Sequence, residues 1–113
     1  MSEVLVLAED ECIRVTCAEV LTRRGFRARG APLRAPAPDD GFPNAIVAWE
    51  ASANDVAEIR AAFGHVPVVV CTWAWREVWP EGVSPVRLPL DVERLTQLLH
   101  DTLRRAERAA AHG

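Results

Sequence analysis

Val66-Pro67-Val68-Val69-Val70-Cys71-Thr72 is the stretch of this sequence that decides the fold. It is the most strongly β segment of the chain, because valine is a β-branched residue that fits a pleated, buried surface. Pro67 stands near its first position, where a missing backbone donor is tolerable. A continuous apolar run of this length is typical of a strand in a buried parallel sheet.

Further strands are predicted on both sides of this segment. They are two short apolar runs, a weak edge strand and a final strand, at residues 4–7, 45–48, 27–30 and 83–88. Helical patterns separate these runs along the chain. The alternation predicts an α/β fold, a doubly wound sheet of about five parallel strands with helices on both faces.

Three stretches have helical patterning and recognisable ends. The first begins near Asp10 and ends at Gly25, which suits a helix terminus. The second begins with a capping-box arrangement of Ser52 and Asp55. The third is a long helix capped by Asp91. Its apolar stripe consists of Val92, Leu95, Leu98, Leu99 and Leu103.

Two other connections are too rich in helix-breaking residues for full-length helices. Residues 31–43 contain four prolines and an Asp-Asp-Gly sequence, which predicts a loop with at most one helical turn. Residues 76–82 contain Pro80 and Gly82, which leave room for only a turn or two of helix. A doubly wound fold would therefore have its second helix lost or reduced and its fourth helix shortened.

The length and charge of the chain limit its class. The 113 residues, 1–113, are expected to form one domain with a single core. A net charge of −3 gives no general attraction to nucleic acid or to anionic membranes. No apolar run approaches the length of a membrane span, and the N-terminus lacks a signal-peptide pattern, so we expect a cytoplasmic protein.

The three cysteines do not form a metal-binding pattern. Cys12, Cys17 and Cys71 lie in predicted helix or strand and lack the paired short spacing of a zinc site. We expect them to be buried small hydrophobic residues.

Unusual residues gather where the predicted strands end. Parallel α/β sheets form their sites at the carboxyl ends of the strands. The residues found at these ends are Glu9 and Asp10, Trp49 and Glu50, Thr72 and Trp73, and Leu88.

The arrangement resembles the receiver domain of bacterial response regulators over nearly the whole chain. Residues 4–11 are similar to the opening strand of a receiver and its acidic pair. Asn44-Ala45-Ile46-Val47-Ala48-Trp49 is similar to the strand that ends in the phospho-accepting aspartate. Thr72 matches the switch hydroxyl residue, and Leu88-Pro89 replaces the usual lysine-proline.

The resemblance implies which parts of the phosphotransfer site are present. Glu9 and Asp10 correspond to the acidic pair that holds magnesium, but Trp49 takes the position of the aspartate and Leu88 that of the lysine. All 13 basic residues of the chain are arginine, so no other lysine can substitute. Glu50 is displaced by one residue, which on a strand turns it to the other side. We therefore expect a degenerate receiver pocket with no catalytic residue, no cofactor and no enzymatic activity.

The acidic pair is also a weak candidate for metal binding. Two carboxylates without a third ligand make a poor magnesium site. We expect Glu9 and Asp10 to form a solvated acidic loop that caps the following helix, with no metal.

Tryptophan is the positive signal in the sequence, with 4 copies. Trp49 and Trp73 are expected to crowd the vacated pocket, either as core or as the wall of a ligand site. Trp75 and Trp79 are the better candidates for exposure. Together with Trp73 they could form an aromatic interaction surface, since tryptophan is favoured at binding hot spots.

The leading hypothesis is a pseudo-receiver domain that acts as a phosphorylation-independent protein-interaction or signalling module. It would bind a signalling protein, and a homodimer could form through the face that receivers build from their fourth helix, fifth strand and fifth helix, here residues 76–106. The alternative is a small-ligand sensor with an aromatic pocket in place of the phosphoryl site. A third hypothesis, a phosphoacceptor that is still active through Glu50, requires chemistry for which the cation is missing.

Overall fold

A single parallel sheet organises the protein, as the computed structural model shows for residues 2–34 and 41–112. Within these residues the sheet has five strands in the order β2-β1-β3-β4-β5, all parallel. The strands are β1 (Glu3–Leu7), β2 (Arg27–Ala31), β3 (Ala45–Trp49), β4 (Val68–Thr72) and β5 (Val83–Arg87). The predicted doubly wound α/β fold is confirmed, including the edge position of β2.

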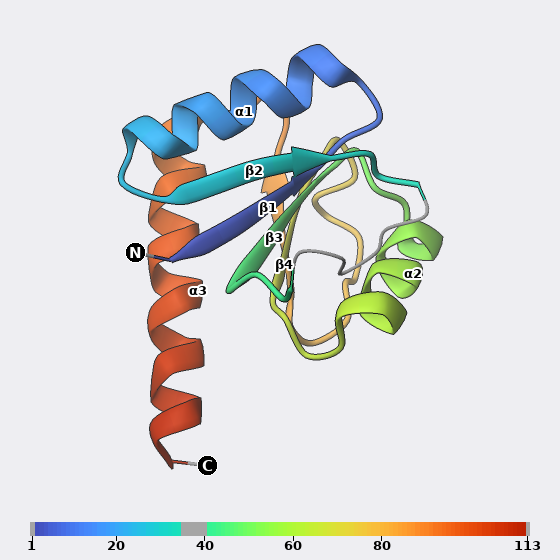
Figure 1. The fold of residues 1–113 in the computed structure, drawn as a ribbon. Coiled ribbons are helices and arrows are strands. Elements are labelled where there is room, and N and C mark those ends of the chain that lie inside the picture. Colours follow the sequence, from blue (N-terminus) through green and yellow to red (C-terminus); the bar gives the residue numbers. More distant parts are fainter. Residues whose placement is uncertain (1, 35–40, 113) are drawn as a thin grey trace.

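Helices cover both faces of the sheet (Figure 1). In the part of the chain that the structure describes they are α1 (Glu11–Arg23), α2 (Ala53–Phe63) and α3 (Val92–His112). The buried side chains of α1 and α3 belong to one core cluster, and those of α2 belong to a second cluster. α1 and α3 therefore share one face, and α2 covers the other. Among the described residues, no helix is long and apolar enough to cross a membrane.

The caps that the sequence predicts define the starts of all three helices. The Asp10 carboxylate accepts a hydrogen bond from the Ile13 amide at 3.2 Å, and Ser52 and Asp55 form a reciprocal capping box. Asp91 Oδ1 accepts from the amides of Glu93 and Arg94 at 3.0 and 3.2 Å. Each of these carboxylate or hydroxyl groups satisfies amides that a helix start leaves without an intrahelical partner.

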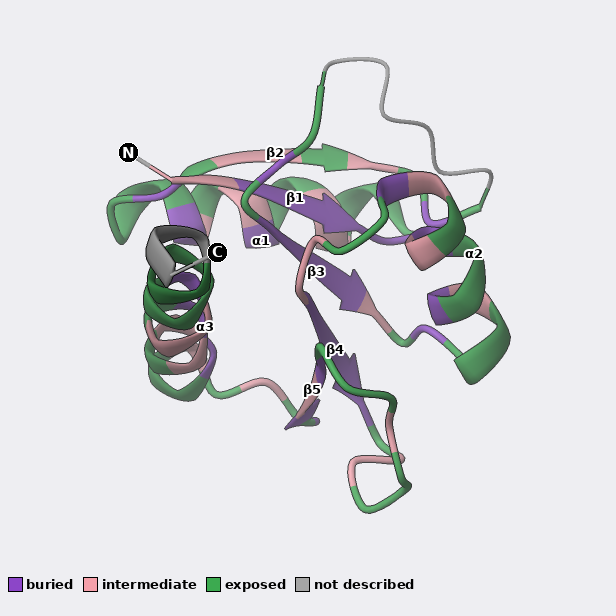
Figure 2. Ribbon diagram, turned by 90° about the horizontal axis from the view of Figure 1, so that it is seen from below, coloured by how far each residue is buried: buried purple, intermediate pink, exposed green. Residues whose placement is uncertain are grey.

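The central strands form the core because helices cover both of their faces. Every residue of β4 is buried, as is all of β3 except the half-buried Trp49 (Figure 2). Side chains alternate between the two clusters along each strand: Val47 belongs to the α1/α3 side and Ile46 to the α2 side. This two-sided burial explains the unbroken apolar runs from which the strands were predicted.

The connection from β4 to β5 differs from the prediction. A turn or two of helix was expected at residues 76–82, but residues 73–82 contain only turns and bends. Pro80 carries no amide, and Gly82 has a φ of 85°, a left-handed conformation that glycine adopts without strain. The fourth helix of a receiver is therefore absent from this chain rather than shortened.

The loop predicted at residues 31–43 is partly described. Ala31 is the last residue of β2, so the strand is one residue longer than expected. Residues 32–34 and 41–43 have neither helix nor strand, as predicted. Residues 35–40 lie outside the described residues, so the prediction of at most one helical turn stays a prediction there. Pro67 also precedes its strand, which begins at Val68.

Candidate functional site

The carboxyl ends of the strands meet along one edge of the sheet. In the observed register Leu7 pairs with Ala48, Trp49 pairs with Cys71, and Thr72 pairs with Arg87. The residues predicted as a site from the strand ends therefore do lie along a common edge. Their side chains, however, serve several different local functions.

Glu9 is engaged by the loop that follows β2. Its Oε1 atom accepts a hydrogen bond from the Arg34 backbone amide at 2.6 Å and lies 3.9 Å from Arg34 Nε. Both side chains are exposed, and the carboxylate ties this loop to the end of β1. Glu9 thus has a structural role that does not depend on a metal ion.

Asp10 is the N-cap of α1, as predicted. The next helical turn supplies a residue that sequence reasoning missed: the Arg14 guanidinium donates from Nη1 to the carbonyl oxygens of Ala8 at 3.1 Å and Glu9 at 3.3 Å. Nothing in the sequence distinguished Arg14 from other helical arginines. Its charge lies beside the β1 end and stabilises the backbone of the acidic loop.

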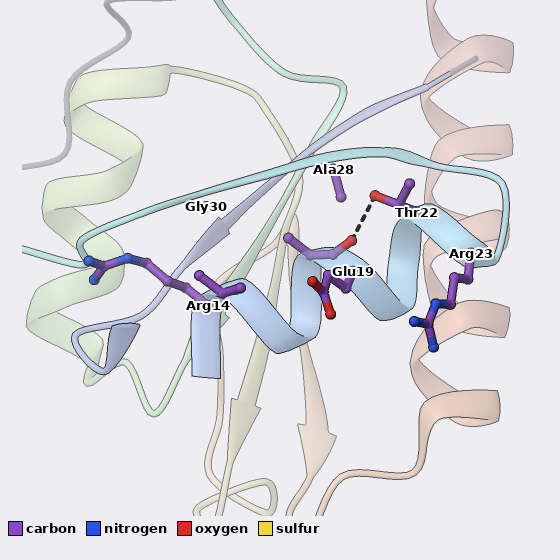
Figure 3. Close-up of a pocket in the computed structure, with 8 residues that line it drawn as sticks. Arg14, Glu19, Thr22, Arg23, Ala28 and Gly30 are labelled. Atoms are coloured by element: carbon purple, nitrogen blue, oxygen red, sulfur yellow. Dashed lines mark hydrogen bonds between the residues drawn. The ribbon is translucent and has the colours of Figure 1, made fainter. Parts of the chain in front are cut away.

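Gly30 makes this position of Arg14 possible. A Cβ atom at Gly30 would come within 3.2 Å of Arg14 Cβ, so glycine permits the close approach of α1 and β2. Figure 3 shows the adjoining hollow, about 440 Å³, between this helix and strand. The Arg14 guanidinium extends away from the other labelled side chains, toward the end of β1.

Trp49 lies at the end of β3 and packs on the α1/α3 side. It is half-buried against the same cluster that contains Cys17, Leu21 and Leu95. It also lines a hollow of about 330 Å³ whose other walls come from α1 and the start of α3. The side chain is therefore part core and part pocket wall.

Glu50 turns to the opposite side, as the strand alternation predicted. Its φ of 52° is left-handed, and its backbone amide donates to Cys71 O at 2.7 Å. Its Oε1 atom accepts a hydrogen bond from the Trp73 indole at 3.0 Å. A carboxylate held in this way lies with Trp73 on the wall of a separate hollow, with no lining residue in common with the Trp49 hollow.

The prediction that Trp49 and Trp73 crowd one pocket is therefore wrong. Trp73 is 65% exposed, whereas Trp75 and Trp79, expected to be the exposed pair, are both intermediate. Trp79 packs against the α2-side cluster, and Trp75 lies under two arginines. Absence of the fourth helix explains this, because the irregular segment folds back on the sheet and leaves Trp73 outside.

Thr72 and Leu88 close the edge between β4 and β5. Thr72 is 6% exposed, and its Oγ1 accepts a hydrogen bond from the Ala74 amide at 2.9 Å. The Leu88 amide donates to Thr72 O at 3.1 Å, and its side chain is 4% exposed within the α1/α3 cluster. The Leu88-Pro89 peptide bond is cis. An apolar side chain here can neither neutralise nor bind an anion.

The described part of the chain brings no three histidine, cysteine or acidic side chains together in a way that could hold a metal ion. Burial raises the pKa of Cys17 to about 11. Burial, and then the neighbouring Cys17, raises the pKa of Cys71 to about 12. These two thiols stay protonated and unreactive at neutral pH. Cys12 was expected to be buried but is exposed, because it faces outward in the first turn of α1.

No family model and no curated protein sequence matches the chain. Its fold, in contrast, is similar to solved receiver structures. A response regulator receiver domain protein from Clostridium thermocellum aligns with a TM-score of 0.77 and 16% identity, over 96% of this chain and 99% of that one. Chemotaxis protein CheY4 of Vibrio cholerae aligns with a TM-score of 0.70 and 18% identity, over 90% and 98%.

A longer protein matches through one part only. NtrX of Brucella abortus aligns with a TM-score of 0.75 and 18% identity over 98% of this chain, which spans 29% of the NtrX chain. Identities at this level establish the fold and leave the activities of these proteins with them. With its strand order, its two helical layers and these alignments along almost its whole length, the chain has the fold of a response-regulator receiver domain.

Proposed function

We propose that this protein is a pseudo-receiver, a signalling module that binds a protein partner without being phosphorylated. One observation carries the proposal: the two positions that the resemblance pairs with the acceptor aspartate and the lysine, Trp49 and Leu88, both belong to the apolar α1/α3 cluster. Phosphoryl transfer to a carboxylate needs a nucleophile and a cation at this point. Neither side chain supplies one.

The remaining carboxylates give further support. Glu9 is held by Arg34, Asp10 caps α1, and Glu50 accepts the Trp73 indole hydrogen bond. Recruiting any of them to a magnesium ion would break a local interaction that stabilises the fold. The proposal therefore assigns no enzymatic activity to this edge.

Exposed apolar side chains favour a protein-binding role. Trp73 is 65% exposed and Val78 is 99% exposed, both in the connection between β4 and β5. Tryptophan is enriched at the centres of protein interfaces, where its large area is desolvated on binding. This connection adjoins β5 and α3, so the proposed partner surface lies within residues 73–106. A homodimer through residues 76–106 is one form of the proposal, and light scattering across a concentration series measures it.

The test is partner capture under two conditions. The tagged chain is incubated with extract of its native cell, once with EDTA and once with acetyl phosphate and Mg²⁺. A phosphorylation-independent module captures the same partner equally in both, and a Trp73→Ala, Val78→Ser variant captures less. Capture only with acetyl phosphate and Mg²⁺ contradicts the proposal.

The hollow beside Trp49 favours a second candidate function, a small-ligand sensor. Its volume of about 330 Å³ lies at the lower end of small-molecule pockets, and its walls are almost wholly apolar. An uncharged, apolar molecule is the ligand class that fits. A metabolite that saturably changes tryptophan fluorescence, with the change lost in Trp49→Phe and with empty partner captures, would establish this function in place of the first.

A further inference from the structure

Three arginines gather around Trp75 at the free edge of β5. The guanidinium carbon of Arg76 lies 4.8 Å from the centroid of the Trp75 ring, and that of Arg87 lies 5.5 Å from it. Arg94, in the first turn of α3, lines the same hollow of about 350 Å³ as Trp75 and Arg87. We call Trp75, Arg76, Arg87 and Arg94 the arginine–tryptophan patch.

The arginines of the patch differ from others in the chain in having no ion-pair partner. Within residues 2–34 and 41–112, none of the three forms an ion pair, whereas Arg24, Arg27, Arg34 and Arg104 each pair with a carboxylate. Asp91 also lines the hollow, but its carboxylate caps α3 by accepting from two amides. All three arginines are exposed, so they present positive charge outward on a chain whose net charge is −3.

The chemistry of the patch selects an anionic partner. A guanidinium is planar and weakly hydrated and binds a carboxylate through two parallel hydrogen bonds. Stacking on the Trp75 ring restrains Arg76 and Arg87 before a partner arrives, which reduces the side-chain entropy lost on binding. The indole supplies apolar area between the charges.

The backbone of β5 argues against binding by strand addition. The Leu88 amide donates to β4, and Gly82 accepts from β4, so the even-numbered residues of β5 face β4 and the odd-numbered ones face the free edge. Pro85 is at an outward-facing position and has no amide hydrogen, which interrupts the ladder that an added strand would need. Side chains, and not the strand edge, must carry recognition here.

A second copy of the chain also fits the patch poorly. A twofold contact places the same surface on both subunits, so a dimer centred on the patch would bring unpaired arginines face to face. Like charges held this way repel. The patch therefore works against the homodimer considered for this face and favours a partner of opposite charge.

We propose that the arginine–tryptophan patch binds an acidic segment of a partner protein, one with carboxylates spaced among apolar residues. This inference rests on the proposed function and names the chemistry of its partner. Negative net charge argues against nucleic acid as the ligand, because the rest of the surface would repel the phosphate backbone.

The experiment measures fluorescence anisotropy with a labelled peptide of alternating glutamate and leucine, about a dozen residues long. The expected result is binding at physiological salt that weakens about tenfold when glutamine replaces glutamate in the peptide. Arg87→Glu and Arg94→Glu should each weaken binding about tenfold, and Trp75→Ala several-fold. Circular dichroism confirms that each variant is folded.

Arg105→Glu is the matched control. Arg105 is exposed on the same helix as Arg94, about three turns further along, and the substitution changes the net charge identically. Equal weakening by Arg105→Glu and Arg94→Glu would mean that only overall charge matters, which overturns the inference. Equal affinity for the two peptides, or tighter binding of a single-stranded oligonucleotide, overturns it as well.

Partner capture separates the failure of this inference from that of the proposed function. If capture from extract persists in Arg87→Glu, the partner uses another surface, and only the acidic-segment inference fails. If capture requires acetyl phosphate and Mg²⁺, the proposed function itself fails.

Discussion

The end of β1 and the ends of β3 and β5 lie along one edge of the sheet but carry opposite chemistry. After β1, Glu9 and Asp10 remain exposed and bind backbone amides of nearby segments. At the ends of β3 and β5, Trp49 and Leu88 are instead packed into the apolar α1/α3 cluster. The acidic side serves local structure through hydrogen bonds, and the apolar side serves it through burial.

This difference shows how a receiver fold can persist without a phosphoryl pocket. Carboxylates at an exposed helix start are useful without a metal, because a helix leaves unpaired amides there. A charged pair at the ends of β3 and β5 has no such use once phosphoryl transfer is gone, and apolar side chains there add to the core. Substitutions on the apolar side should therefore cost more stability than substitutions on the acidic side.

Leu88→Lys should have the largest effect. It places an amine at a position that is 4% exposed and should lower the free energy of unfolding by about 3 kcal/mol. Urea denaturation followed by circular dichroism measures the change. Leu88→Met, which conserves volume, should cost less than about 1.5 kcal/mol. Equal stability of Leu88→Lys and the native chain would show that the position tolerates a cation.

Trp49→Ala should come next, at about 2 kcal/mol, since the ring is half-buried against the core. Trp73→Ala is the matched control: the ring is 65% exposed, and its loss should change stability by no more than about 0.5 kcal/mol. Urea denaturation of both variants makes the comparison. The reverse order of the two effects would mean that Trp73, and not Trp49, fills the edge.

Asp10→Ala should have an intermediate effect on the acidic side. Loss of the N-cap of α1 should cost about 1 kcal/mol, and Asp10→Asn, which keeps an acceptor oxygen, should cost less. Thermal unfolding measures both. A cost as large as that of Leu88→Lys would contradict the division between the two sides.

Glu9→Gln should have the smallest effect, within about 0.5 kcal/mol, because the pair with Arg34 is exposed and the amide oxygen still accepts the backbone hydrogen bond. Millimolar Mg²⁺ should leave the Tm of the native chain unchanged, since binding to the folded state would raise it. A Mg²⁺-dependent rise that disappears in Glu9→Gln would mean that the acidic pair still holds metal.

The sequence predicted those parts of the fold that depend on local chemistry. Apolar runs located the buried strands, and Asp10, Ser52 and Asp91 marked the helix starts, because their oxygens satisfy amides only a few residues away. The common edge followed from the geometry of parallel sheets. Of the site, the opposite orientations of Trp49 and Glu50 followed from strand alternation.

Features that depend on long-range packing could not be predicted in the same way. The positions of Trp73, Trp75 and Trp79 follow from how an irregular segment folds against the sheet, which has no periodicity to read. Arg14 contacts the β1 end only because Gly30 lets α1 approach β2. Cys12 is exposed because of its place on the surface of α1, although its residue type favours burial.

Intact-mass spectrometry after treatment with acetyl phosphate and Mg²⁺ tests the central claim most directly. A receiver domain that retains its acceptor aspartate, treated in parallel, shows that the reagent is active. Our account predicts that this chain keeps its unmodified mass, because Trp49 and Leu88 supply neither nucleophile nor cation. The addition of a phosphoryl group that disappears in Glu50→Ala would contradict it.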